Sequence, residues 1–411
     1  MTAESTTSLL SLSATDIAAR YRSLLLEGLM PFWFAHGIDW EYGGVLSCMK
    51  EDGTPVNTDK FLWSQARSVW TFAALYNRVE PRPEFLEAAA NSVRFLLAHG
   101  RDERGRWVYK TNRQGRVLEG ATSIYTDCFV VYGLSEYIRA TGEDHLLNVA
   151  LDTYRLIQHR IEEPGFHETA PYPLPNDWKN HGVPMIMTEV TNELIQTTGN
   201  AALESSLDLY IDRVIHKFRS PKHKVILEFL DSGFQELPPP AGTFVMPGHA
   251  IESMWFMLHV ARRRNDATLL REASETIKWH LERGWDDSFG GLFLSCDHAG
   301  GTPYLPNGEM KIWWPHTEAL YGTLLAFALT GDAEFLDWFA RIETWSWQHF
   351  PMPSGGEWYQ RLSRTGEPST EVVGLPVKDP FHLPRAAVLI MQLAQSLSSE
   401  DATKRQGTTR A

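Results

Sequence analysis

The chain has 411 residues, of which 43% are hydrophobic and 22% charged, a balance typical of a globular protein with an extended core. Its net charge of -13 and the lack of a basic block argue against binding to nucleic acid or to an anionic membrane surface. Cys48, Cys128 and Cys296 are far apart and form no CxxC pair, so we expect neither a disulfide framework nor a metal site.

The N-terminal segment MTAESTTSLLSLSATD has no basic region followed by a sustained apolar region, which argues against a signal peptide. No run along the chain approaches the roughly 18 apolar residues that a membrane-spanning helix needs. We therefore expect a cytoplasmic protein that does not enter a membrane.

Apolar residues recur at helical spacing along almost the whole chain and predict about twelve helices. The first follows SATD, a Ser-x-x-Asp pattern typical of a capping box. The predicted helices are centred near residues 25, 68, 90, 129, 151, 187, 208, 257, 275, 320, 340 and 390.

The joints between these helices alternate in length. Short polar joints such as RATGED and ALTGDAE lead from even-numbered helices to odd-numbered ones, whereas long joints follow the odd-numbered helices. Loops this long inside a compact protein usually carry function. The long joints cover residues 37–59, 100–120, 163–178, 220–247, 285–310 and 351–380.

The long joints contain a repeated pattern. DWEYGGVLSCMKEDGT (39–54) matches DDSFGGLFLSCDHAGGT (286–302), with an acidic start, a Gly-Gly turn and alternating residues. SGGEWYQRLSRTGEP (354–368) and ERGRWVYKTNRQGRV (103–117) are similar. Gly pairs followed by period-two alternation predict short β-hairpins.

Six helical hairpins with all long loops on one side predict an all-α fold, an (α/α)6 barrel with the odd-numbered helices outside and the even-numbered helices inside. An open solenoid such as a tetratricopeptide array is the alternative, but its repeats are near 34 residues and have short loops. The units here span about 60–70 residues, which favours the barrel. We expect residues 1–411 to form one domain, with disordered tails at 1–13 and 397–411.

In such a barrel the N-termini of the inner helices line one mouth, where a pocket is expected. A proline lies close to the histidine in VMPGHAIES, WWPHTEAL and DPFHLPR, and proline in a first turn fixes where a helix starts. The candidate side chains near these helix starts are Arg67, Tyr125, Asp127, Trp178, His249, Glu252, Trp314, His316, Glu318, His382 and Arg385.

The partial positive charge at a helix N-terminus disfavours imidazolium, so we expect lowered pKa values for these histidines and a role as general bases. Glu252, three residues after His249, could orient its ring or bind a sugar hydroxyl. Arg67 and Arg385 could stabilise negative charge that develops on a substrate oxygen. Each residue also has a structural alternative, such as a helix cap, a core contact or a salt bridge. Three histidines at equivalent positions of three helices favour the functional interpretation.

At these residues the sequence resembles the N-acylglucosamine 2-epimerase family, which also includes cellobiose 2-epimerases and mannose-active epimerases and isomerases. The matching segments run from about residue 20 to residue 395 and include KFLWSQARSVW, SIYTDCF, PGHAIESMWF, MKIWWPHTEAL, GEWYQRLSRTGE and FHLPR. SIYTDCF and MKIWWPHTEA are closer to the N-acylglucosamine branch than to the disaccharide branch.

The resemblance implies an (α/α)6 barrel that inverts C2 of a reducing sugar through a cis-enediolate, without a redox cofactor. It implies that His249 and His382 are the acid/base pair on opposite faces of C2, and that Arg67 holds the enediolate oxygen. Further substrate contacts are expected from Glu252, His316, Glu318, Arg385, Tyr125, Trp314 and Trp178.

The resemblance also implies a small-molecule reducing sugar as substrate and a homodimer as one possible assembly. ATP as an effector rests on the resemblance alone, because the chain has no GxxxxGK[ST] or GxGxxG segment. The sugar stays open between N-acylhexosamine, free hexose and disaccharide, as does epimerisation against aldose–ketose isomerisation. The loop at 164–185 is where we expect the substrate to be selected.

Two other classes remain as alternatives. An inverting glycoside hydrolase would use two carboxylates about 6.5–9.5 Å apart, for which Glu252 could pair with Glu318 or Asp127. A non-catalytic sugar-binding protein would use aromatic platforms without two opposed bases.

Overall fold

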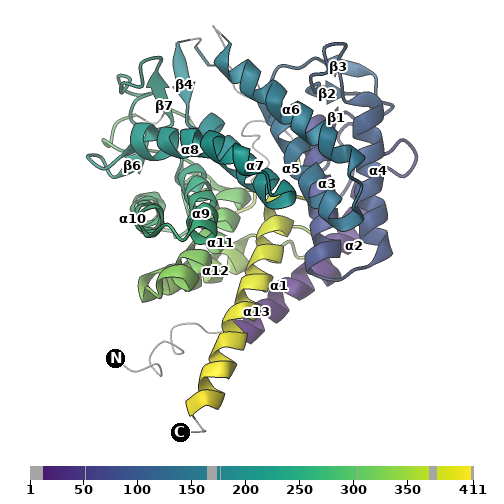
Figure 1. Ribbon diagram of the computed structural model, residues 1–411. Coiled ribbons are helices and arrows are strands. Elements are labelled where there is room, and N and C mark those ends of the chain that lie inside the picture. The colour runs from purple at the N-terminus through teal and green to yellow at the C-terminus, as the bar shows by residue number, and fades with distance from the viewer. Residues whose placement is uncertain are drawn as a thin grey trace.

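Two sets of helices alternate along the chain in the computed structural model, which describes residues 13–50, 52–163, 174–175, 177–302, 304–369 and 377–408 (Figure 1). The outer set consists of α1 (Ala14–Ser23), α4 (Pro83–His99), α6 (His145–Glu162), α8 (Glu204–Asp212), α10 (Ala267–Gly284) and α12 (Ala333–His349). The inner set consists of α3 (Leu62–Arg78), α5 (Ile124–Thr141), α7 (Gly182–Thr198), α9 (Pro247–Arg264), α11 (Trp313–Thr330) and α13 (His382–Thr408).

Two outer helices continue beyond these bounds in other helical forms. After α1 come the π-helical turn Leu24–Leu29, the short α2 (Met30–Phe32) and a second π-helical turn, Trp33–Gly37. A 3-10 turn, Ala201–Leu203, precedes α8, and the π-helical turn Arg213–Phe218 follows it.

The inner helices form a closed ring. Each contacts the next in the order α3, α5, α7, α9, α11 and α13, and α13 contacts α3 again. Each outer helix packs against its inner neighbour, and α1 packs along α13, so that the first and last helices lie side by side (Figure 1). This arrangement confirms the predicted (α/α)6 barrel.

Burial explains why the sequence divides the helices in this way. In the inner helix α11 every residue from Pro315 to Ala326 is buried, because neighbours surround it. In the outer helix α10 the buried residues, among them Leu269, Ala273 and Ile277, recur at helical spacing on one face. None of the described helices combines the length and apolar character needed to cross a lipid bilayer.

The strands are two or three residues long and lie between the helices. They are β1 (Lys60–Phe61), β2 (Lys110–Thr111), β3 (Val117–Glu119), β4 (Trp178–Asn180), β5 (Arg219–Ser220), β6 (Val225–Ile226), β7 (Phe229–Asp231), β8 (Phe244–Val245), β9 (Cys296–Asp297), β10 (Lys311–Ile312) and β11 (Arg361–Leu362).

The strand pairing differs in part from the predicted local hairpins. Pairs β1–β2, β4–β7, β8–β9 and β10–β11 each join two different long loops. The Gly-Gly turns close only single bridges, such as Ile38 with Val45 and Trp285 with Leu292. The sequence repeat therefore marks turns, whereas the regular pairing tethers neighbouring loops at the mouth.

A buried lysine anchors an inner helix in each of the two best-matching repeats. Lys60 precedes α3 and donates to Asp39 (2.9 Å), and Lys311 precedes α11 and donates to Asp286 (3.1 Å). Both lysine side chains are 0% exposed. Arg364 adds a second cation at Asp286, with its Nε atom 2.9 Å from Oδ2.

The residue five positions after each buried lysine completes the same module. Gln65 Oε1 accepts from the backbone N–H of Val45 at 2.6 Å, and His316 Nε2 accepts from that of Leu292 at 2.8 Å. Both backbone groups directly follow a Gly-Gly turn. Gln65 and His316 thus have the same structural role in the two repeats, because each side chain accepts a hydrogen bond from the backbone N–H after the Gly-Gly turn.

The C-terminal end differs from its prediction. Residues 397–408, expected to be a disordered tail, belong to α13, which continues to Thr408. Residues 1–12 and 409–411, in the other parts of the predicted tails, lie outside the described residues. One cluster of buried apolar side chains draws on both rings, which is consistent with the single domain that we predict.

We expect Asp286→Ala to lower the free energy of unfolding by about 3–5 kcal/mol, because it leaves the buried Lys311 without its carboxylate. Urea denaturation measures the change. The neighbouring Asp287 is the control, since its side chain is 93% exposed, and Asp287→Ala should change the value by less than about 0.5 kcal/mol. Equal effects of the two substitutions would contradict the anchoring role.

Candidate active site

The starts of α9 and α13 carry the two histidines predicted to transfer protons. Pro247 is the first residue of α9 and places His249 in its first turn, and His382 is the first residue of α13. The ring of Trp314, from the first turn of α11, is close to both, with its centre 6.1 Å from that of His249 and 5.8 Å from that of His382. The structure thus brings these three predicted residues together.

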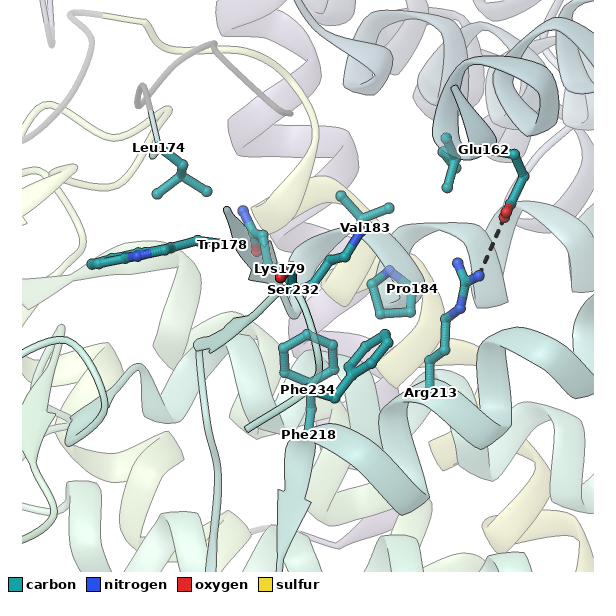
Figure 2. A pocket seen from close by; sticks show the side chains of 12 residues that line it. Glu162, Leu174, Trp178, Lys179, Val183, Pro184, Arg213, Phe218, Ser232 and Phe234 are labelled. Atoms are coloured by element: carbon teal, nitrogen blue, oxygen red, sulfur yellow. Dashed lines mark hydrogen bonds and ion pairs between the residues drawn. The ribbon is translucent and has the colours of Figure 1, made fainter. Parts of the chain in front are cut away.

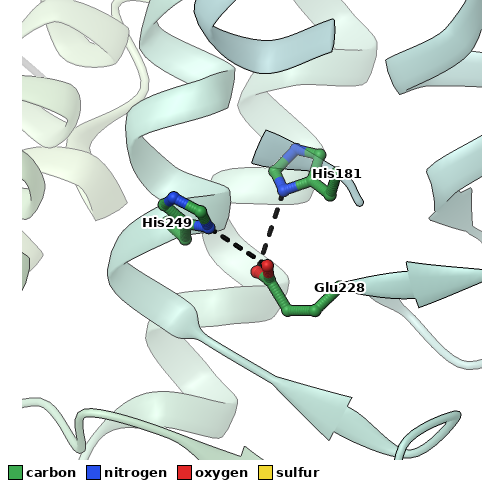
Figure 3. Close-up of side chains that lie close together, drawn as sticks. All are labelled: His181, Glu228 and His249. Carbon is green, nitrogen blue, oxygen red and sulfur yellow. Dashed lines mark hydrogen bonds and ion pairs between the residues drawn. The ribbon is translucent and has the colours of Figure 1, made fainter. Parts of the chain in front are cut away.

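His249 is held by a glutamate that the sequence did not single out. Its Nδ1 atom lies 3.1 Å from Oε2 of Glu228, which is 2% exposed (Figure 3). Because an ionised carboxylate only accepts hydrogen bonds, Nδ1 carries the proton. The Nε2 atom of His249 has no hydrogen-bond partner among the described residues and is left for a bound molecule.

A third histidine lies on the other side of this carboxylate. Nδ1 of His181 is 3.7 Å from Oε1 of Glu228, and the ring of His181 stands perpendicular to that of His249 at 5.7 Å (Figure 3). Nε2 of His181 lies 3.1 Å from Oγ of Ser253. Glu228 therefore lies between two imidazoles, one fully buried and one facing the mouth.

His382 is held in the same way by a different glutamate. Its Nδ1 atom is 2.7 Å from Oε1 of Glu318. Arg385, which is 2% exposed, ion-pairs with Glu318 (2.9 Å) and with Glu252. Trp255 donates from Nε1 to Oε2 of Glu318 at 2.9 Å. Glu252, Glu318 and Arg385 thus form a buried ionic cluster behind His382.

The two histidines have opposite protonation tendencies. Burial lowers the pKa of His249, but the charge and hydrogen bond of Glu228 outweigh burial, so that the pKa is raised above its ordinary value. Burial, together with the positive charges of Arg67 and Arg385, lowers the pKa of His382 to about 3. The prediction of a lowered pKa is therefore wrong for His249, because the full charge of Glu228 exceeds the partial charge of a helix end.

Arg67 lies in α3 with its guanidinium over the ring of Phe129, at 4.1 Å from the ring centre. It donates from Nη1 to Oδ2 of Asp379 at 3.1 Å, and its buried Nε atom has no partner among the described residues. Asp379 precedes the start of α13 by three residues, so this ion pair joins α3 to the segment that carries His382.

Tyr125 belongs to the His249 side of the site. A Cβ atom added to Gly182 would lie 2.1 Å from the Tyr125 hydroxyl and 3.3 Å from Cε1 of His249. A side chain at position 182, at the start of α7, would therefore require the Tyr125 hydroxyl to move.

Three candidates lie apart from this group. His316 is fully buried, its Nδ1 and Nε2 atoms contact the backbone at Ile312 (2.7 Å) and Leu292 (2.8 Å), and its ring stacks on Trp345. It has no ring nitrogen left for a sugar, so its predicted role is not supported. Asp127, also fully buried, ion-pairs with Arg160 at 3.1 Å.

Trp178 is the third of these. It is the first residue of β4, and its ring lies 5.4 Å from that of Phe229 in a second apolar cluster. It lines a cavity of about 200 Å³ together with Val183, Pro184 and Arg213 (Figure 2). Neither of the two predicted catalytic histidines lines this cavity. Residues 164–173, part of the loop expected to select the substrate, lie outside the described residues.

Two groups of three side chains in the site bring ring nitrogens and carboxylate oxygens close together, as metal sites also do. His181, Glu228 and His249 place one ligand atom each within 4.8 Å of one another, as do Glu252, Glu318 and His382. In the second set the guanidinium of Arg385 already supplies the positive charge. In the first set Nδ1 of His249 donates its proton to Glu228, so this nitrogen has no lone pair left for a metal ion.

Comparison with known proteins decides the family. Residues 44–386 match the family described as N-acylglucosamine 2-epimerase (GlcNAc 2-epimerase). The chain belongs to the N-acylglucosamine 2-epimerase family.

Individual relatives are similar over most of their length. The N-acylglucosamine 2-epimerase of Bos taurus is 29% identical, over 91% of this chain and 90% of its own. The D-mannose isomerase of Pseudomonas cannabina pv. alisalensis is 28% identical, over 67% of this chain and 70% of its own. The solved cellobiose 2-epimerase of Spirochaeta thermophila shares the fold, with a TM-score of 0.80 at 22% identity, over 93% of this chain and 98% of its own. The protein is thus an enzyme of an epimerase and isomerase family.

Three residues of the candidate site were not predicted from the sequence. His181 stands before Gly182 at the start of an inner helix, a signal of the same kind as that for His249. Glu228, in the apolar segment VILEFL, and Asp379 gave no comparable signal, because long loops carry them. Their positions follow from tertiary contacts, not from helical periodicity.

Glu228→Gln should lower the pKa of His249 below its ordinary value, because the substitution removes the charge that raises this pKa and leaves burial, which lowers it. NMR titration of the His249 Cε1 proton measures the change. Glu236→Gln is the control, since Glu236 contacts His223 in an exposed loop. An unchanged His249 titration in the Glu228 variant would contradict the assignment.

Proposed function

We propose that the protein interconverts N-acyl-D-glucosamine and N-acyl-D-mannosamine by removing the proton at C2 and returning one to the opposite face. The observation that carries the proposal is the pair formed by His249 and His382, which both lie close to the ring of Trp314 and have pKa values pushed in opposite directions. Titratable groups whose environments separate their pKa values in this way are suited to be acid and base.

In the proposed mechanism the sugar ring opens to the free aldehyde, and neutral His382 takes the C2 proton on its Nε2 atom. Negative charge develops on the C1 oxygen, where the guanidinium of Arg67 holds it; for a sugar with nitrogen at C2 the intermediate is the corresponding enolate. After rotation about the C2–C3 bond, protonated His249 gives its proton to the other face of C2. The reverse reaction uses the same residues with their roles exchanged.

The buried carboxylates support these two proton transfers. Glu228 stabilises the protonated form of His249, and Glu318 orients the ring of His382 by its Nδ1 atom at 2.7 Å. Both transfers are assigned to side chains, so the proposal requires no cofactor.

The geometry disfavours an inverting glycosidase. Arg385 pairs with both Glu252 and Glu318, which leaves neither carboxylate free to act with a water molecule between them. The third carboxylate considered, Asp127, is fully buried against Arg160. The activities of the mannose isomerase and cellobiose epimerase relatives are the alternatives within the family, since both use the same kind of proton transfer next to a carbonyl.

Proton NMR in D₂O tests the activity and the substrate together. We expect N-acetylmannosamine to incorporate deuterium at C2 and to form its 2-epimer, with mannose, glucose and cellobiose in separate tubes for comparison, each with and without ATP. A ketose product, or exchange on a free hexose or disaccharide alone, would assign one of the alternative activities. No exchange on any sugar would refute the proposed reaction.

His249→Ala and His382→Ala should each lower kcat by about 10²–10⁴-fold, because each removes one group that we propose to transfer a proton. The control is His316→Gln, which should keep most of the activity because Gln65 makes the equivalent backbone contact in the other repeat. Steady-state kinetics of the three folded variants measure the effect. Normal turnover in either alanine variant would remove that histidine from the mechanism.

A further inference from the structure

The neighbourhood of Glu228 holds a histidine that the proposed proton transfers do not use. His181 is 0% exposed, and its Nδ1 and Glu228 Oε1 are buried atoms without a hydrogen-bond partner among the described residues, 3.7 Å apart. A polar pair buried in this way, next to an acid/base residue, requires an explanation.

Strand pairing fixes the position of His181. In the β4–β7 ladder Lys179 pairs with Leu230 and Asn180 with Phe229, so the next positions along the two strands are His181 and Glu228. The backbone N–H of His181 donates to the backbone oxygen of Glu228 at 3.0 Å. The ladder therefore holds the backbone positions of His181 and Glu228 next to each other.

Helix α9 holds the far side of the His181 ring. Oγ of Ser253 lies 3.1 Å from Nε2, and a serine hydroxyl can donate to this nitrogen. The neutral ring then directs its Nδ1–H toward Glu228. The carboxylate thus faces an N–H from His181 on one side and an N–H from His249 on the other (Figure 3).

We propose that His181 is a positioning residue that holds Glu228 from the side opposite His249 and so sets the pH range over which His249 can carry the proton for C2. This inference rests on the proposed function. A carboxylate that faces the positive end of a second N–H dipole attracts the first N–H less strongly, and so holds a proton on His249 less strongly.

The electrostatics of the surrounding groups agree with this role. Burial would raise the pKa of Glu228, but His249 and His181 together hold it at about 2. Burial keeps the pKa of His181 below its ordinary value, so that this ring acts as a neutral dipole. Among the described residues, the other titratable groups near the pair include Glu252 on α9, His280 on α10 and Tyr125 on α5, and burial lowers the pKa of His280 to about 4.

Removing His181 should therefore make His249 keep its proton to a higher pH. His181→Phe retains the ring packing against Phe218 and His249 but removes the N–H. We expect the NMR titration of the His249 Cε1 proton, and the basic limb of the pH–activity profile, to move upward by roughly half to one pH unit. Glu228→Gln moves both in the opposite direction, so general loosening of the site does not explain an upward shift.

His181→Asn is the rescue variant, because its amide N–H can take the place of Nδ1–H, and it should restore the wild-type titration. His280→Gln, at a neighbouring buried histidine bound to the backbone of Ile226 and Thr276, should leave the His249 titration unchanged. If His181→Phe does not fold, the His249 titration is compared between His181→Leu, which lacks the N–H, and His181→Asn, which restores it.

An unshifted His249 titration in the phenylalanine or leucine variant would overturn the proposal, as would a shift that the asparagine variant fails to reverse. The NMR titration does not depend on turnover. If the wild-type protein exchanges no C2 proton on any sugar, the proposed function fails, while the titration still decides the role of His181.

Discussion

The interior of the barrel depends on the ion pairs that the buried guanidinium of Arg385 makes with Glu252 and Glu318. Arg385 comes from the last inner helix, α13, and its two carboxylate partners come from α9 and α11. A single charge left unpaired at this depth would cost several kcal/mol, so the three groups stabilise one another only as a set. Because Glu318 also holds His382, the packing of three inner helices and the placement of one histidine proposed to transfer a proton depend on the same ionic cluster.

Much of the fold could be predicted, because it follows from local regularities. Helical periodicity and the alternation of short and long loops predict the double ring of helices. An inner helix must be apolar on all sides, whereas an outer helix is apolar on one face only. The end of α13 falls in a segment that we expected to be a disordered tail. Residues 397–408 include few apolar residues in the sequence, but Ala, Glu, Lys, Arg and Gln are good helix formers and extend a helix that has already begun.

The candidate site could be predicted only where helices carry it. His249, Trp314 and His382 come together because each begins an inner helix, and all inner helices begin at the same mouth. Glu228 and His181 could not be placed, because their proximity depends on pairing between two short strands from different loops. His316 matched the same sequence pattern as His249 and His382, and yet both of its ring nitrogens make hydrogen bonds to the backbone.

The anchoring lysines have a consequence for how such a protein changes over evolution. Lys60 and Lys311 fasten α3 and α11, each to an aspartate of the preceding long loop, beneath the surface that faces the mouth. Each of these helices is therefore held in place by its own lysine, whereas the loops at the mouth are joined to one another by strand pairs. Anchors of this kind keep the starts of the inner helices in place while the rim varies, and the similar proteins are named for different sugars: N-acylglucosamine, D-mannose and cellobiose.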